Sequence, residues 1–195
     1  MEKLFATALM FAIGLWLWAE YFREIPHLQQ AGVLKNFQVT SIEPHQAEYR
    51  VLSTKFYSPQ RRMLHPASPV IGSYEDLAYL SVVDVLLAEP HVPDVALKQV
   101  KLDQTARCFN IQAKDHQQTD FEPYRLGIQH LSLIAETDAL TQAIRALKKH
   151  QRIQLVGDWV EVHSVKTHKA YYVGFGSAQS QQCHLFLVKQ IIRLN

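Results

Sequence analysis

The first 24 residues carry an almost unbroken run of apolar side chains. Residues 4–19 contain no charge, and Tyr21 and Phe22 extend the run to a stretch of about 19 residues that only Glu20 interrupts. A helix rises about 1.5 Å per residue, so this stretch approaches the roughly 30 Å thickness of membrane hydrocarbon. The pattern predicts one transmembrane helix within residues 1–24.

Three kinds of segment have this composition: an uncleaved signal anchor, a cleaved signal peptide and a core helix of a soluble protein. Cleavage requires small residues before the cut, and Trp18 and Tyr21 suit it poorly. A core helix would have a polar face, yet residues 4–19 offer only Thr7. The signal anchor is therefore favoured. Its predicted membrane-contacting residues are apolar or aromatic and span its length: Leu4, Phe11, Trp16 and Trp18.

The flanks of the segment indicate its orientation. The amino terminus and Lys3 precede it, and Arg23 follows it between two glutamates. Lysine and arginine concentrate on the cytoplasmic side, which, with a very short N-terminal flank, favours a cytoplasmic N-terminus. We therefore predict a single-pass protein of the inner (cytoplasmic) membrane, with its following domain in the periplasm.

Beyond residue 24 the pattern changes to short strands separated by turns. Residues 25–47 contain Pro26 and Pro44 and are predicted to be a connector, and residues 48–195 one soluble, β-rich domain. The strand candidates are β-branched, aromatic or alternating in polarity. They cover residues 49–57, 80–88, 107–112, 126–135, 152–163, 170–175 and 183–192.

One segment of this domain has helical spacing. Thr137 or Asp138 can cap it, and four apolar residues share one face. These four are Leu140, Ala143, Ile144 and Leu147. Cationic residues are concentrated at its C-terminal end, where positive charge interacts favourably with the helix dipole and aids solubility. The alternative interpretation is contact with an anionic partner or lipid headgroups. The cationic residues are Arg145, Lys148, Lys149 and His150.

The order of elements is strands, one helix, then strands. This order predicts a mainly β domain of the α+β class, built as a small, partly open, OB-like β-barrel behind the N-terminal transmembrane helix.

The run from Gly127 through the helix into a Gly-Asp-x-Val-x-Val strand carries a resemblance. Here the strand motif reads Gly157-Asp158-Trp159-Val160-Glu161-Val162. The run resembles bacterial single-pass membrane proteins of uncharacterised function, which combine an anchor with an extracytoplasmic β-rich (OB-like) domain. The resemblance covers about 60 residues plus the anchor. It implies location and architecture, and carries over no catalytic residue.

Charge and cysteine content narrow the function classes. The formal charge of +2 is too small to indicate nucleic acid as a partner. Cys108 and Cys183 can form one disulfide in an oxidising compartment, or remain two buried thiols, and their spacing does not decide between these.

The chain lacks the motifs of common enzymes. It has no P-loop, dinucleotide fingerprint, nucleophile elbow, zinc-protease helix or Cys-x-x-Cys pair. We therefore predict no catalytic residue, metal or cofactor. His163, His168 and His184 would hold zinc only if they converged, which their spacing does not require.

A cysteine nucleophile is a further alternative. An anchored β-barrel with a late cysteine, Arg193 after it and His116 or His130 before it is similar in outline to sortases. The resemblance would make Cys183 the nucleophile. The sequence departs from the sortase Thr-Leu-x-Thr-Cys strand, because Gln179-Ser180-Gln181-Gln182-Cys183 stands there.

The favoured function is a membrane-anchored, non-enzymatic interaction or assembly module of the cell envelope. Its predicted partners are the lipid bilayer and an envelope protein, not nucleic acid. The alternative is a small membrane-surface enzyme or ligand-binding domain, including sortase-like chemistry at Cys183. The predicted contact surface combines the long 58–75 loop with an aromatic edge: Arg61, Arg62, Tyr171, Tyr172 and Phe175.

Overall fold

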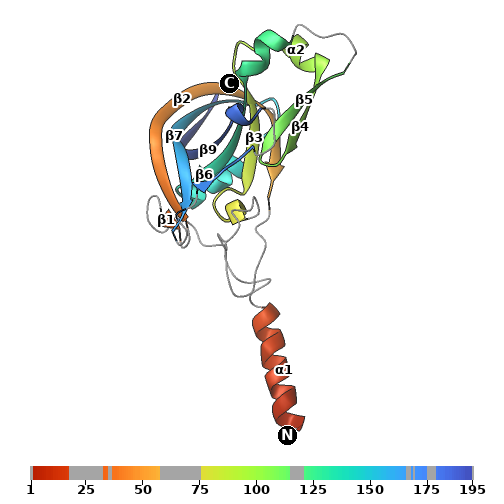
Figure 1. Ribbon diagram of the computed structural model, residues 1–195, viewed down its shortest axis with the longest axis vertical. Helices are drawn as coiled ribbons and strands as arrows, with labels where there is room; N and C mark the ends of the chain where they lie inside the picture. The colour runs from red at the N-terminus through yellow and green to blue at the C-terminus, as the bar shows by residue number, and fades with distance from the viewer. Residues whose placement is uncertain are drawn as a thin grey trace.

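The computed structural model shows a mainly β protein with a few helices (Figure 1). It describes residues 2–17, 33–34, 37–57, 76–114, 121–165, 168, 170–174 and 179–194.

Helix α1 (Glu2–Leu17) stands apart from the β-sheet (Figure 1). Its 16 residues rise about 24 Å. Every side chain from Leu4 to Leu17 is exposed, including large apolar ones on all sides of the helix. Within the described ranges, no helix is both long and apolar enough to cross a membrane.

Seven strands form one sheet in the order β1-β2-β3-β6-β9-β7-β8. All neighbouring pairs are antiparallel except β6 and β9, which are parallel. The strands are β1 (Val33–Leu34), β2 (Phe37–Phe56), β3 (Val83–Ala88), β6 (Ile128–Ala135), β7 (Arg152–Ser164), β8 (Ala170–Tyr171) and β9 (Cys183–Leu194).

The long strand β2 pairs with a different strand along each half, so the sheet curves back on itself. Residues 37–50 pair with β7, and residues 50–56 pair with β3. The second half of the predicted connector is thus strand. Pro44 is accommodated because β7 is the only described strand beside it, and an edge position tolerates a residue with no N–H to donate.

The coiled sheet encloses an apolar core. Alternate residues of β3, namely Val83, Val85 and Leu87, point into it and meet Leu131 and Leu133 of β6. Burying both faces of β3 explains why its run is apolar rather than alternating. The interior is therefore filled by side chains.

Helix α3 (Asp138–Arg145) follows β6 and packs on this core through Ile144. The Thr137 hydroxyl caps it by accepting a hydrogen bond from the Leu140 N–H at 3.2 Å. The helical spacing in this part of the sequence predicted the helix correctly.

An inserted arm lies between β3 and β6. It consists of helix α2 (Asp94–Gln99), a hairpin of β4 (Val100–Thr105) and β5 (Cys108–Ala113), and a 3₁₀ turn at Glu122–Gly127. The arm covers the face of β3 and β6 opposite the core, where Leu86 and Ile128 pack against Phe109. The sequence pattern predicted β5, but neither α2 nor β4.

Strands β7 and β9 approach each other closely at Gly157, beside a shift in their register. A Cβ atom on Gly157 would collide with the Leu187 carbonyl oxygen and the Phe186 ring. Only glycine, which has no Cβ atom, fits at this position without a shift of β9.

Replacing Gly157 with alanine is expected to lower the free energy of unfolding by about 3 kcal/mol, because the β9 backbone must move away from an added methyl group. Urea denaturation of the full chain measures it. Gly14→Ala is the control, since a Cβ there meets nothing within 4 Å. Equal midpoints for Gly157→Ala and the wild type would contradict the close approach.

Candidate functional site

The tip of the β4–β5 hairpin is an unusual turn. Ala106 and Arg107 have φ values of 48° and 55°, in the left-handed region that residues other than glycine rarely adopt. Such a backbone persists where surrounding contacts hold it. The contacts here are buried, because the Arg107 side chain is fully inaccessible.

Arg107 is held by an ion pair with Asp84 of β3. Its Nη1 lies 2.7 Å from Asp84 Oδ1 and donates to the Ser81 hydroxyl at 3.2 Å. The guanidinium also lies 3.9 Å from the centre of the Tyr57 ring. Asp84 is as inaccessible as Arg107, so each charge depends on the other for compensation.

The groups around Asp84 have shifted proton affinities. Burial raises the pKa of Asp84, and the Arg107 charge opposes that shift. Burial, assisted by the Arg107 charge, lowers the pKa of His130 to about 3, and burial raises the pKa of Tyr57 to about 12. His130 is therefore neutral near pH 7 and stacks against Phe109.

This buried group of Arg107, Asp84, His130 and Tyr57 is built for packing rather than catalysis. His130 Nε2 lies 3.8 Å from Asp84 Oδ2, with both side chains fully inaccessible to solvent. A substrate cannot reach these atoms without displacing the arm. The group therefore fixes the arm on the sheet.

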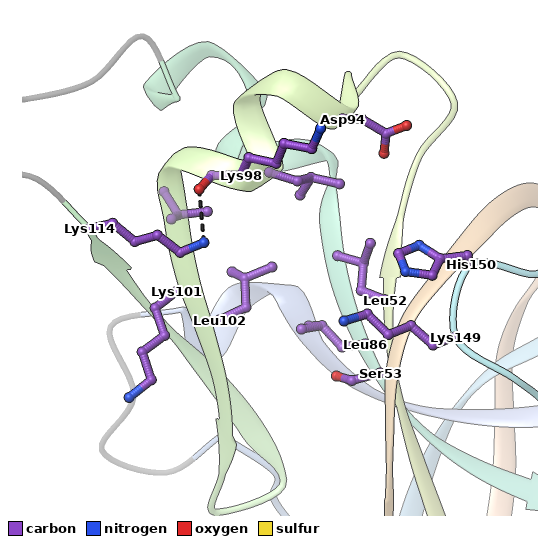
Figure 2. Close-up of a pocket in the computed structure, with 12 residues that line it drawn as sticks. Leu52, Ser53, Leu86, Asp94, Lys98, Lys101, Leu102, Lys114, Lys149 and His150 are labelled. Carbon is purple, nitrogen blue, oxygen red and sulfur yellow. Dashed lines mark hydrogen bonds between the residues drawn. The ribbon is translucent and has the colours of Figure 1, made fainter.

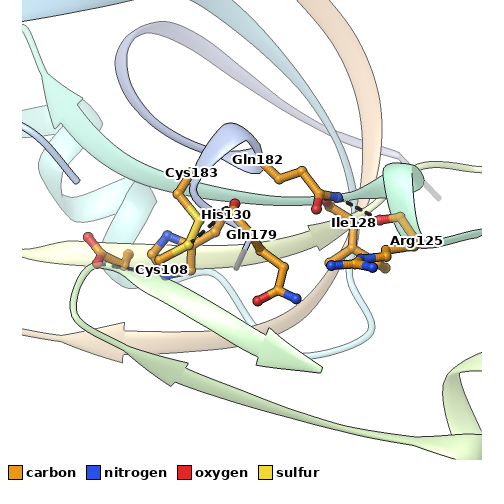
Figure 3. Close-up of a disulfide and its surroundings, with 8 residues drawn as sticks. Cys108, Arg125, Ile128, His130, Gln179, Gln182 and Cys183 are labelled. Atoms are coloured by element: carbon orange, nitrogen blue, oxygen red, sulfur yellow. Dashed lines mark hydrogen bonds and ion pairs between the residues drawn. A yellow bond between two sulfur atoms is a disulfide. The ribbon is translucent and has the colours of Figure 1, made fainter. Parts of the chain in front are cut away.

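A disulfide between Cys108 and Cys183 provides a second attachment (Figure 3). It joins the start of β5 to the start of β9, with the Cα atoms 5.4 Å apart. Of the two alternatives that spacing left open, the structure has the disulfide. Cys183 consequently has no thiol to act as a nucleophile, which removes the central residue of the sortase-like alternative.

Gln182 positions the turn before Cys183. Its side-chain amide donates to the Arg125 carbonyl at 2.6 Å and the Ile128 carbonyl at 2.8 Å, as Figure 3 shows. These bonds hold the beginning of β9 against the 3₁₀ turn at Glu122–Gly127 and the first residue of β6.

A cleft lies between the arm and the sheet (Figure 2). It has a volume of about 400 Å³. Its floor is aliphatic: Leu52, Leu86, Leu97, Val100 and Leu102. Its rim carries cationic or titratable nitrogen groups: Lys98, Lys101, Lys114, Lys149 and His150.

Positive charge prevails at this rim. Among the described lining residues, Asp94 has the one carboxylate, and it is 2.6 Å from Arg50, a cation outside this lining. Lys149 extends over the floor towards Leu86, whereas Lys101 points away from it (Figure 2). In the described lining, the cleft thus presents an apolar surface beneath four ammonium groups and one carboxylate, that of Asp94.

A second cleft, of about 280 Å³, is lined by charges of both signs. It lies beside β2 and β7, and its lining includes Glu48, Glu89, Arg50 and Arg152. Arg152 lies 3.6 Å from Glu48. This mixture of charges favours an anionic or cationic ligand less than the lysine-rich rim of the first cleft does.

The predicted contact residues separate into three groups. Tyr171 is buried with its ring centre 5.2 Å from that of Phe37, so its place in the contact surface is corrected. Tyr172 is 73% exposed and remains available. Three residues lie outside the described ranges: Arg61, Arg62 and Phe175.

The predicted membrane-contacting residues are exposed where the structure describes them. Leu4, Phe11 and Trp16 lie on α1, and Trp18 lies outside the described ranges. Three converging metal ligands do not occur in the described part of the chain, where His163, His168 and His184 all lie.

The cleft was only partly visible in the sequence. The cationic cluster after α3 supplied Lys149 and His150, for which contact with an anionic partner was one alternative. The remaining lining residues come from β2, β3 and the arm, and only the fold brings them together.

Comparisons with protein-family models, curated proteins and solved structures find no match to this chain. The resemblance to bacterial single-pass membrane proteins therefore stays a prediction.

The neutral state of His130 predicts a pH-dependent stability. The unfolded chain binds this proton near the ordinary pKa of 6.5, but the folded domain does so only near 3. The stability that comes from burying neutral His130 is fully present above pH 6.5. It is lost as the pH falls from 6.5 towards 3, by up to about 1.4 kcal/mol per pH unit.

We expect His130→Phe to flatten this dependence in urea denaturation at about pH 7 and about pH 5. Asp84, His45 and His184, whose pKa values are also shifted, are present in both proteins. The difference in how the free energy of unfolding changes with pH therefore reports His130. His91→Phe, at a half-exposed position, is the control. Parallel slopes for His130→Phe and the wild type would contradict a neutral buried histidine.

Proposed function

We propose that this protein is a membrane-anchored, non-enzymatic interaction module of the cell envelope. The observation that carries the proposal is the exposure of apolar side chains all around α1. A helix that is apolar on every side needs lipid or protein to cover it. In the sequence the apolar stretch continues beyond Leu17 to Phe22, interrupted only by Glu20.

The proposed compartment is extracytoplasmic. Disulfides persist in oxidising compartments and are rare in the cytosol. The Cys108–Cys183 bond pairs both cysteines of the chain inside the packed domain. This pairing supports a periplasmic domain and an N-terminus on the cytoplasmic side.

Within this proposal the domain is an OB-like variant. Five strands follow the cyclic order β2-β3-β6-β9-β7, because β2 also pairs with β7. One parallel pair, β6 and β9, and helix α3 between the third and fourth strands support a partly open, five-stranded Greek-key barrel.

The inserted arm supports a partner other than nucleic acid. OB folds bind oligonucleotides on the face of their second and third strands. The equivalent strands here are β3 and β6, and the β4–β5 hairpin covers their outer face. The filled interior and the paired Cys183 likewise favour binding over catalysis.

A ligand-binding domain is the second candidate function. The observation that favours it is the cleft beneath the arm, with its aliphatic floor and lysine rim. Such a domain is compatible with the same anchor.

A topology experiment tests the proposed location. An alkaline phosphatase fused after Asn195 should be active in a Gram-negative host, whereas a reporter that works only in the cytoplasm should be inactive. The intact protein should keep Met1 to Leu17 by mass spectrometry and stay in membranes after an alkaline wash.

Replacing Leu9 and Phe11 of α1 with glutamate should release the protein from the membrane fraction, because each charge is costly in hydrocarbon. The double replacement of Glu43 and Glu48 by glutamine, on β2, is the control and should leave it bound. Activity of the cytoplasmic reporter alone, or retention of the α1 variant, would contradict the proposal.

A further inference from the structure

We propose that the cleft between the arm and the sheet binds a monomeric amphiphile with one anionic head group and an aliphatic tail. The inference rests on the second candidate function, a ligand-binding domain, and names the class of its ligand; it does not depend on where the protein is located. It rests on the composition and construction of the cleft.

The floor selects the tail. Leu86 is completely buried, and Leu52 and Val100 are nearly so, while Leu97 and Leu102 are half-buried at the sides. The volume of about 400 Å³ lies within the range of small-molecule sites. Leu97 and Leu102 keep apolar surface in contact with water, and an aliphatic tail that covers them removes this surface from water while packing on the buried floor, so such a tail is favoured.

The rim selects the head group. Its described residues include four lysines and one carboxylate, that of Asp94, which pairs with Arg50. Lysine presents a compact ammonium with three donors, which suits a phosphate or carboxylate. Lys149, which reaches over the floor, is placed to meet a head group whose tail lies beneath it (Figure 2).

Backbone contacts fix both walls of the cleft. His150, in a left-handed conformation with φ 69°, donates its backbone N–H to the Val51 carbonyl at 2.7 Å. This bond sets Lys149 beside Leu52. On the opposite wall, Gln104 of β4 accepts from Ser53 and from Lys55 of β2 at 2.9 and 2.7 Å.

The lining does not suit a nucleic acid. Single-stranded nucleic acids stack their bases on aromatic side chains along a basic groove. The lining contains no phenylalanine, tyrosine or tryptophan among the described residues, and His150 is its one ring. An amphiphile uses both the aliphatic floor and the lysines.

The test uses the full chain in nanodiscs of neutral phosphatidylcholine, with octyl phosphate as the probe and empty discs as the blank. Calorimetric titration should show one site. Inorganic phosphate lacks the tail and octyl glucoside lacks the charge, so each should bind at least about tenfold more weakly.

Lys149→Gln should weaken octyl phosphate binding by about tenfold, whereas Lys148→Gln should leave it unchanged. The two variants lose the same charge at neighbouring exposed positions, but only Lys149 lines the cleft. The circular dichroism melting curves of both variants should match the wild type, because neither side chain is buried.

Three outcomes would overturn the proposal. The first is no binding above empty discs. The second is an equal effect of Lys148→Gln and Lys149→Gln. The third is inorganic phosphate or an acidic peptide, such as hexaglutamate, binding as tightly as octyl phosphate, which would show an anion site without a tail site.

Discussion

The buried ion pair between Arg107 and Asp84 determines where the inserted arm lies. Two charges removed from water stabilise a fold only while each has the other as its partner. Arg107 projects from a strained turn at the hairpin tip, and Asp84 lies on β3, so their contact specifies one docking position. The disulfide from Cys108, the next residue, then ties the same tip to β9.

The surface of the domain follows from this docking. The hairpin covers the outer face of β3 and β6, and its other end leaves a cleft beside β2. The outer face of β3 and β6 is thus internal, and the cleft lies at the edge of the arm. Helix α1 lies apart from this arrangement.

Local sequence patterns predicted the elements that depend on local interactions. The Thr137 cap and the helical spacing of Leu140 and Ile144 can be read from the local sequence, although packing of Ile144 on the core stabilises α3. The first half of β2 was missed because Pro44 resembles a strand breaker, and only pairing with distant β7 shows that it occupies an edge. Arg107 has the sequence character of a surface charge, and its burial depends on Asp84, 23 residues away.

A double-mutant cycle on Arg107 and Asp84 tests whether their ion pair holds the arm on the sheet. In urea denaturation, Arg107→Met and Asp84→Leu should each lower the free energy of unfolding by about 3–5 kcal/mol, because each strands one buried charge. The double variant should lose far less than their sum. Single variants as stable as the wild type, or strictly additive losses, would show that the pair does not hold the arm in place.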